Sequence, residues 1–482
     1  MTLPSTTATD QGSTLYVLLA TIVAATSGLL FGFDIAVING ALIFLREQLH
    51  LTEVETEMAA SSLLFGCIFG ASAAGWLSDR FGRKRVLTIA GLLFALSAIG
   101  AAVPRTLAQF AAARLAGGLA VGAASVLAPL YIAEVAPAKN RGMLVALNQM
   151  TIVTGILLSY LVNWLLAFDA QNGWRWMFAT AAVPATIFFI AMFFVPESPR
   201  WLVENVRSPE ALRVLTRVNG GAIAWSELEQ IQMSVAQETG SLLELLQPGL
   251  RRAFWIAVSL AILQQITGIN TVLFYGSIIF KEHVAHQSNS SAVFANVVVG
   301  VVNFLMTMVA LGLIDKLGRR PLLMISTAMM AICQAALGFA FLLKAPPAML
   351  VLTIVLFCVA AFAVGLGPGF WVLLSEIFPT RIRGRAMSIA TICLWIACTV
   401  LTMTFLSLVK AVSATGAFLV YSGMCVVTFF IVWRFVPETK GRTLEEIEQF
   451  WVYPAKAGVF SGRPSQGNSQ EPCSLDSREE GN

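Results

Sequence analysis

About twelve apolar segments of membrane-spanning length run through this chain of 482 residues. A helix needs roughly 20 apolar residues to cross the hydrocarbon core of a bilayer. Only 12% of the residues are charged, which is about half the share found in soluble proteins. The sequence therefore predicts an all-α membrane protein. We expect the spans at 15–45, 57–78, 86–103, 107–133, 142–166, 175–195, 253–280, 291–314, 321–343, 347–375, 386–410 and 415–435.

Basic residues alternate between the connections. The links after the second, fourth, eighth and tenth spans hold clusters of Lys and Arg, whereas the other links hold mostly one basic residue each. Basic loops stay in the cytoplasm, so we expect these clusters and both termini there. The net charge of +4 is small, and no nucleic-acid partner is expected.

The chain divides into two similar halves. Residues 196–252 interrupt the apolar rhythm with charged amphipathic patterns, which predicts a cytoplasmic helical linker between six-helix bundles at 15–195 and 253–436. Residues 1–14 are expected to be a disordered tail. Residues 437–482 are expected to be a cytoplasmic segment that ends in a second disordered tail. Three motifs recur in the same order, which favours a transporter with its ligand site between the halves. They are Asp79-Arg80-Phe81-Gly82-Arg83-Lys84 and Asp315-Lys316-Leu317-Gly318-Arg319-Arg320, Glu134…Arg141 and Glu376…Arg383, and Val195-Pro196-Glu197 and Val436-Pro437-Glu438.

Three amides lie in the middle of the seventh span, which we expect to be one continuous helix. They are Gln264, Gln265 and Asn270. Polar groups at that depth are costly without partners. Amides both donate and accept without carrying charge, which suits a ligand rich in hydroxyls. The alternative is that they hydrogen-bond neighbouring helices and hold the bundle together.

Asp34 is an acid inside the first span, and Arg114 is a base inside the fourth. Ionisable residues at such depth face a cavity or each other, and burial favours the protonated form of a carboxylic acid. The two residues are therefore expected to pair. The alternative to a functional pair is a static structural ion pair.

The motifs resemble those of the sugar porters of the major facilitator superfamily. The resemblance rests on Gly75-Trp76-Leu77-Ser78-Asp79-Arg80-Phe81-Gly82-Arg83-Lys84, Pro196-Glu197-Ser198-Pro199-Arg200-Trp201, the amides of 264–270 and Pro437-Glu438-Thr439-Lys440-Gly441. It covers roughly 15–450. It implies a twelve-helix major facilitator fold and a proton-coupled symporter that imports a hexose or pentose by alternating access. It also implies a bacterial inner membrane, a monomer within the lipid bilayer, no enzymatic activity, and no cofactor besides the proton as coupling ion.

The resemblance also implies a set of sugar-binding residues. Departures from the family pattern at Phe274, Leu394 and Cys398 leave the identity of the sugar open. For the tryptophans taken alone, lipid exposure or core packing is the alternative. The implied sugar ligands are Phe31, Gln149, Gln264, Gln265, Asn270, Asn303, Gly367, Trp371 and Trp395, and the implied proton-coupling residues are Asp34 and Arg114.

The repeated charged motifs are similar to a cytoplasmic gate of the family. A network that forms in one conformation and breaks in the other shifts a two-state equilibrium, although the same charges could serve only to set topology. The expected gate residues are Asp79, Arg83, Glu134, Arg141 and Glu197 in one half, and Asp315, Arg319, Arg320, Glu376, Arg383 and Glu438 in the other.

Three other functions fit the sequence less well. A facilitative uniporter is disfavoured because facilitators of this family commonly have Asn where this chain has Asp34. A sugar sensor of this family tends to have a long cytoplasmic tail, whereas the polar tail at 452–482 is short. A membrane enzyme is disfavoured because the three histidines and seven scattered cysteines form no cluster with the spacing of a catalytic or metal site.

Overall fold

The computed structural model describes residues 13–137, 141–169, 171–237, 245–247, 250–283, 288–343, 346–379 and 382–441. Of the predicted tail at 1–14, only Ser13 and Thr14 are among these residues, and of the predicted segment at 437–482, only 437–441. Ser13 already belongs to the ordered chain, because its hydroxyl caps the first helix through Tyr16 N at 3.3 Å. Its backbone N–H also donates to Arg217 O of the linker at 2.9 Å.

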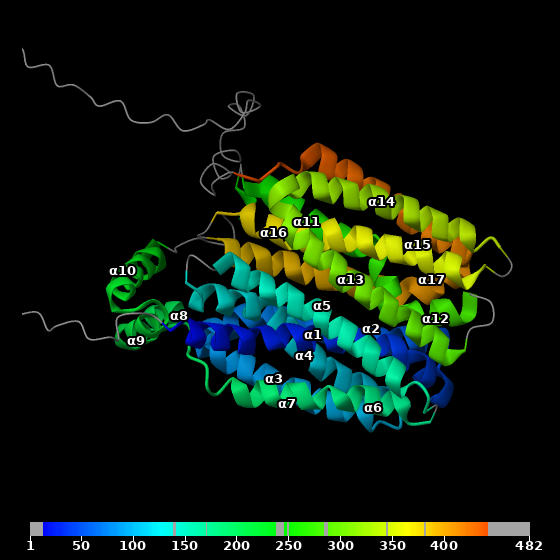
Figure 1. Ribbon diagram of the computed structural model, residues 1–482, viewed down its shortest axis with the longest axis horizontal. Helices are drawn as coiled ribbons and strands as arrows, with labels where there is room; N and C mark the ends of the chain where they lie inside the picture. The colour runs from blue at the N-terminus through cyan, green and yellow to red at the C-terminus, as the bar shows by residue number, and fades with distance from the viewer. Residues whose placement is uncertain are drawn as a thin grey trace, which may run out of the picture.

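The N-terminal half is a bundle of six spans (Figure 1). Its sixth span is broken near Ala181, because Pro184 has no N–H to donate to the carbonyl of Thr180. The helices are α1 (Thr14–Gln48), α2 (Glu53–Phe81), α3 (Arg83–Ala102), α4 (Leu107–Val135), α5 (Arg141–Leu166), α6 (Gly173–Thr180) and α7 (Ala182–Ala191).

The linker contributes three short helices that lie at one end of the molecule, on the left in Figure 1. Trp201, Leu202, Ala211 and Leu215 form a small apolar core of their own there. The helices are α8 (Pro199–Glu204), α9 (Ser208–Asn219) and α10 (Gly221–Gln237).

The C-terminal half lies beside the first half, in the upper part of Figure 1. Its tenth span contains a π-helical turn, in which Gly367 N donates to Phe362 O, just before Pro368. The elements are α11 (Leu250–Ile266), α12 (Ile269–His283), α13 (Asn289–Leu317), α14 (Arg319–Ala340), α15 (Ala348–Ala361), the π-turn η2 (Phe362–Leu366), α16 (Gly367–Glu376) and α17 (Arg383–Phe435).

The predicted count of twelve crossings is confirmed. Among the described residues, eleven helical stretches are long and apolar enough to cross a membrane. The longest, α17, contains two crossings, because Ser413 interrupts it with the non-helical torsions φ 69° and ψ 165°. The prediction of one continuous helix over the seventh span is wrong, since α11 ends at Ile266 and α12 begins at Ile269.

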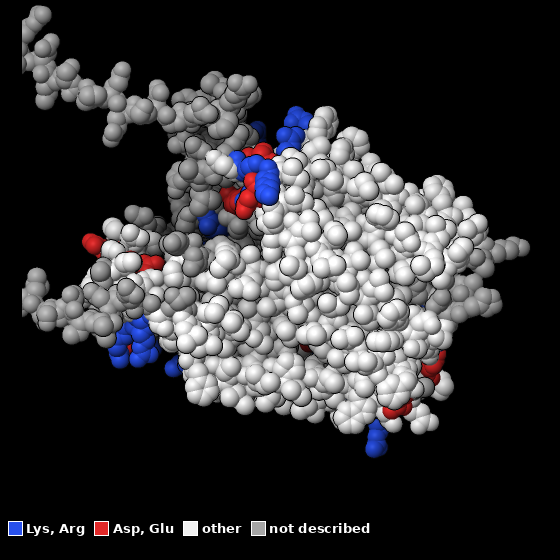
Figure 2. Space-filling model, in the orientation of Figure 1, with Lys and Arg blue, Asp and Glu red and all other residues white. Residues whose placement is uncertain are grey.

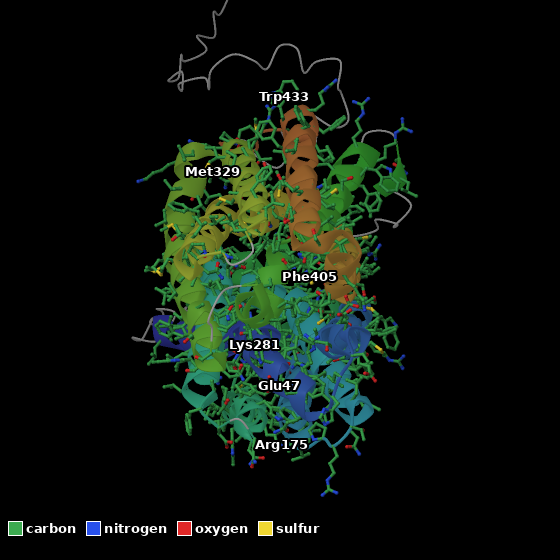
Figure 3. All side chains as sticks on the ribbon, turned by 90° about the vertical axis from the view of Figure 1, so that its right-hand side faces the viewer. Glu47, Arg175, Lys281, Met329, Phe405 and Trp433 are labelled. Atoms are coloured by element: carbon green, nitrogen blue, oxygen red, sulfur yellow. The ribbon has the colours of Figure 1, made fainter. Side chains whose placement is uncertain are left out.

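The surface charge seen in Figure 2 lies mainly at the two ends of the molecule. Figure 2 shows Lys, Arg, Asp and Glu gathered toward the linker end and at the opposite end, with an almost uncharged face between them. We call the end that carries Arg83 and the linker the inner end, and the end that carries Glu47 and Lys281 the outer end. Figure 3 looks onto the outer end, where these last two residues lie close together.

Candidate functional site

The seventh span is broken where its amides gather. Gly268 has φ +82°, a left-handed conformation that a right-handed helix cannot contain and that glycine adopts most readily. A Cβ there would also lie 2.6 Å from the ring of Tyr421. The freed carbonyl of Thr267 accepts a hydrogen bond from Gln334 Nε2 of α14 at 3.0 Å. A broken helix is tolerated within a membrane when neighbouring helices satisfy the freed backbone in this way.

The three predicted amides form one hydrogen-bonded chain across this break. Asn270 of α12 donates to Gln265 of α11, and Gln265 Nε2 donates to Gln264 Oε1 at 3.3 Å. Gln264 Nε2 then donates to the carbonyl of Leu366, in the π-turn of the tenth span, at 3.0 Å. Asn270 Nδ2 also lies 3.4 Å from Cys398 Sγ of α17. The amides thus link four segments of the C-terminal half.

Two predicted aromatic residues meet across the halves. The rings of Phe31 on α1 and Trp395 on α17 have centroids 5.7 Å apart. Trp395 is 3% exposed, and its indole Nε1 is buried with no hydrogen-bond partner among the described residues. A buried donor without a partner is costly and uncommon in folded proteins. It is therefore available to a ligand oxygen.

Three of the remaining predicted sugar ligands do not contact the amide chain among the described residues. Gln149 on α5 is half-buried, Asn303 on α13 is 7% exposed, and Trp371 on α16 packs its ring against Phe370 at 5.2 Å. Within the described part of the chain, none of these three forms a hydrogen bond or ring contact with the amide chain. Gly367 begins α16, directly after the carbonyl that Gln264 binds.

Asp34 and Arg114 form a buried ion pair inside the N-terminal half. Arg114 NH1 donates to the Asp34 carboxylate, and NH2 donates to the Asp34 backbone carbonyl at 2.7 Å. Arg114 is 1% exposed and Asp34 is 7% exposed. Gly117 makes room for the pair, since a Cβ there would lie 3.0 Å from Asp34 Oδ2 and 2.3 Å from Ser97 Oγ. The acid and the base that the sequence suggested as partners are therefore in contact.

At the inner end of the N-terminal half, Arg83 is the centre of the predicted network. It lies 3.2 Å from Glu134, 3.4 Å from Asp79 and 3.4 Å from Glu204 of α8. Burial raises the pKa of the Glu204 carboxyl, although the charge of Arg83 opposes this effect. Glu204 could not be predicted from the sequence, because its contact with Arg83 depends on how the linker folds back onto the bundle.

The C-terminal half repeats this network. Arg319 lies 2.8 Å from Glu376 and 3.0 Å from Asp315. Arg320 donates to the carbonyl of Trp433, and Arg383 Nε lies 3.4 Å from the carbonyl of Phe378. The predicted gate residue Arg141 begins α5, but its side chain lies outside the described residues.

Glu197 and Glu438 occupy equivalent positions at two helix starts. Glu197 accepts from the backbone N of Lys84 at 3.0 Å. Glu438 accepts from the backbone N of Arg319 and of Arg320, each at 3.1 Å. A carboxylate at a helix N-terminus is stabilised by the exposed N–H groups and the helix dipole. The two repeats are therefore similar in hydrogen bonding as well as in sequence.

At the outer end, the halves are joined through Asn39, which is not among the predicted site residues. Asn39 of α1 donates to the carbonyls of Val272 and Leu273 of α12 at 3.0 and 2.9 Å. Its own oxygen accepts from the N–H and the hydroxyl of Ser277 at 2.9 and 2.7 Å. The ion pair of Glu47 with Lys281 lies further out. Asn39 could have been found from the sequence, because it is a polar residue within an apolar span.

Comparison with known proteins gives consistent matches over nearly the whole chain. The family model described as "Sugar (and other) transporter" matches residues 20–451. The arabinose-proton symporter of Bacillus subtilis is 38% identical over 93% of this chain and 98% of its own. The D-xylose-proton symporter of Escherichia coli K12 is 39% identical over 92% of this chain and 97% of its own.

The solved structures agree with the sequence matches. A partially occluded, inward-open structure of the xylose transporter XylE from E. coli matches with a TM-score of 0.80 and 36% identity, over 89% of this chain and 100% of that one. The predicted major facilitator fold is thereby confirmed. The chain, a multi-pass membrane transporter and not an enzyme, belongs to the sugar transporter family of the major facilitator superfamily.

Proposed function

We propose that this protein is a proton-coupled symporter that imports a pentose or hexose by alternating access. The proton is the coupling ion and no cofactor takes part. The protein works as a monomer in a bacterial inner membrane, with the inner end and both termini in the cytoplasm. The relatives named for arabinose–proton and xylose–proton symport support this proposal.

The sugar site is proposed to lie between the amide chain and the aromatic pair. Gln264, Gln265 and Asn270 offer carbonyl oxygens and N–H groups to sugar hydroxyls. The unpaired Nε1–H of Trp395 offers one more donor, and the ring faces of Phe31 and Trp395 suit the apolar C–H face of a sugar ring. Gln149, Asn303, Gly367 and Trp371 complete the proposed site from the surrounding helices.

The buried ion pair of Asp34 with Arg114 is the observation that supports the proposed proton coupling. Asp34 lies in α1, the same helix that supplies Phe31 to the proposed sugar site and Asn39 to the outer end. When Asp34 takes a proton, its ion pair with Arg114 is lost, and the contact keeps only the weaker bond from Arg114 NH2 to the Asp34 backbone carbonyl. When the proton leaves, the pair forms again. Protonation is thereby linked to the position of α1 relative to α4.

Alternating access is proposed to use the two ends in turn. Among the described residues, Asn39 bonds across the halves at the outer end, whereas the ion pairs of Arg83 and of Arg319 at the inner end each join residues of one half. This arrangement corresponds to an inward-facing state. In the outward-facing state, Arg141 and Arg383 are proposed to hold the halves together at the inner end, with the other charged residues of the two motifs as partners.

The test is uptake into proteoliposomes with labelled arabinose, xylose, glucose and galactose, with and without an imposed proton gradient. A membrane potential of about 100 mV supplies roughly 2.3 kcal/mol per charge moved, which corresponds to a sugar gradient of order 50-fold. We expect the wild-type protein to accumulate at least one sugar, and Asp34→Asn to lose accumulation while it keeps counterflow exchange.

Glu229→Gln, at an exposed position on α10, is the control and should accumulate sugar like the wild type. Accumulation by Asp34→Asn under a proton gradient would move the coupling role to another residue. Equilibration without accumulation by the wild type would make the protein a facilitative uniporter.

A further inference from the structure

Asn39 of α1 binds two backbone groups of α12 that an ordinary helix would bind to each other. Its amide oxygen accepts from the N–H of Ser277 at 2.9 Å, and its Nδ2 donates to the carbonyl of Leu273 at 2.9 Å. Ser277 and Leu273 are four residues apart, which is the spacing of the hydrogen bonds within an α-helix. One side chain from the N-terminal half therefore bridges the donor and the acceptor of one turn of α12.

The bridge made by Asn39 resembles an extra peptide group inserted into α12. An amide side chain carries a carbonyl oxygen and N–H donors on one carbon, as the backbone does. Asn39 is 0% exposed, so water does not compete for these bonds. A side chain that inserts between the hydrogen-bonding groups of a helix is a known cause of a local bend. Asn39 thus competes with the internal bond from Ser277 to Leu273.

The residues around Asn39 leave room for this contact. A Cβ at Gly276 would lie 3.1 Å from Asn39 Nδ2 and 2.3 Å from Asn296 Oδ1. Asn296 of α13 accepts from Asn39 Nδ2 at 3.2 Å, and its own Nδ2 donates to the hydroxyl of Ser277 at 2.9 Å. The absence of a side chain at Gly276 therefore lets both amides approach α12.

We propose that Asn39 is a positioning residue of the outer end, and that a hydrogen bond within α12 replaces its contact when the outer end opens. In the inward-facing state, the Asn39 amide holds the N–H of Ser277 and the carbonyl of Leu273. In the outward-facing state, α1 has moved away and these two groups bind each other. This inference rests on the proposed alternating access, which requires the halves to separate at the outer end.

The replacement lowers the cost of opening. A backbone N–H or carbonyl without a partner is costly inside a membrane protein. Opening leaves neither Ser277 nor Leu273 in that condition, because their backbone groups satisfy one another. The closed state keeps the advantage of the other Asn39 bonds, such as the one to the carbonyl of Val272 at 3.0 Å. Loss of one or two such bonds should change the ratio of closed to open molecules by about tenfold.

The first measurement is the width of the outer end, in lipid nanodiscs at one pH and without sugar. Spin labels on Val103→Cys and Met349→Cys, at the outer ends of α3 and α15, report the distance between the halves by double electron–electron resonance. These positions are 68% and 72% exposed. Cys393, which is partly buried, and Cys473, which lies outside the described residues, are replaced by serine. Asn39→Ala should raise the ratio of long to short distances by about tenfold.

The second measurement is deuterium exchange at the Ser277 amide, resolved from its neighbours by electron-transfer fragmentation in the mass spectrometer. In Asn39→Ala the bridge is absent, but the bond to Leu273 should protect the N–H of Ser277. We expect this amide to exchange no more than about threefold faster than in the wild type. A larger increase would show that no bond within α12 replaces Asn39, and it would overturn the proposal.

Gly276→Ala tests the same contact without removing a hydrogen-bonding group. The added methyl group should displace Asn39 from α12, so the outer end should open as in Asn39→Ala, with Ser277 still protected. This variant decides the matter if Asn39→Ala does not fold. An outer end that stays closed in the folded variants would contradict the proposal.

A second contact between the halves provides an opening that keeps Asn39. Glu57 of α2 accepts from the backbone N–H and the hydroxyl of Ser407 of α17, at 2.7 and 2.8 Å, and this contact does not involve α12. Ser407→Ala removes one of these donors and should also raise the open population. Because the wild-type Asn39 is then withdrawn by the opening itself, Ser277 should stay protected here too, and loss of its protection would refute the replacement.

Asn163→Ala is the matched control. Asn163 of α5 is also 0% exposed, but its amide donates to the carbonyl of Val37 within the N-terminal half, at 3.2 Å. Its loss should leave the distances at the outer end unchanged, and opening equal to that of Asn39→Ala would reduce the effect to a general loosening of the bundle. Because neither measurement uses sugar, failure of sugar uptake is recognised separately.

Discussion

Gln265 occupies the middle of the amide chain, so its removal has consequences that can be worked out from its neighbours. In Gln265→Ala, Asn270 loses the acceptor that it now uses, and Gln264 Oε1 loses its donor. Loss of one hydrogen bond to a sugar costs about 1 kcal/mol, and a buried polar group left unpaired costs about 1–3 kcal/mol. At about 1.4 kcal/mol per decade, we expect sugar affinity to fall between roughly fivefold and several hundredfold.

The assay is equilibrium binding in detergent, with the sugar that the wild type transports best. Gln230→Ala, at an exposed position on α10, is the control for the loss of a glutamine. Size-exclusion chromatography and the thermal midpoint establish that both variants are folded. A folded Gln265→Ala variant that binds with wild-type affinity would exclude Gln265 from the sugar site and would favour a purely structural role for the amides.

Two further predictions concern the inner end and the broken span. Arg383→Ala should shift the population toward the inward-open state, which cysteine labelling from the cytoplasmic side would detect; unchanged accessibility would reduce the motif to a topology signal. Gln334→Ala should destabilise the folded protein by about 1–3 kcal/mol, because the carbonyl of Thr267 at the break loses its amide donor. The thermal midpoint in detergent measures this loss, and a midpoint equal to that of the wild type would show that the break needs no such support.

The architecture could be predicted from the sequence because it depends on local properties. Span length, loop charge and the repeated motifs are each readable along the chain, and they led to twelve crossings and two halves. The contact between Asp34 and Arg114 was also predictable, since an acid and a base at similar depth in one bundle have few other partners. The break at Gly268 was not, because glycine also occurs inside continuous membrane helices.

The contacts between the halves could not be predicted in the same way. Asn39, Glu57 and Ser407 each meet a partner from the other half, and the register between two bundles is not encoded in any one segment. Asn39 and Glu57 were visible as polar residues in or near apolar spans. Their partners include backbone groups, whose positions cannot be predicted from any sequence pattern. The contact of Glu204 with Arg83 was missed for the same reason.

The amide chain has a consequence for the turnover of the carrier. Asn270, Gln265 and Gln264 pass hydrogen bonds to one another, and the chain of bonds ends on the carbonyl of Leu366. A sugar must therefore exchange existing bonds for new ones, which limits the net gain and helps release. A symporter must also return empty after each delivery. Because these amides satisfy one another, the return step does not have to bury unpaired amides in the membrane interior.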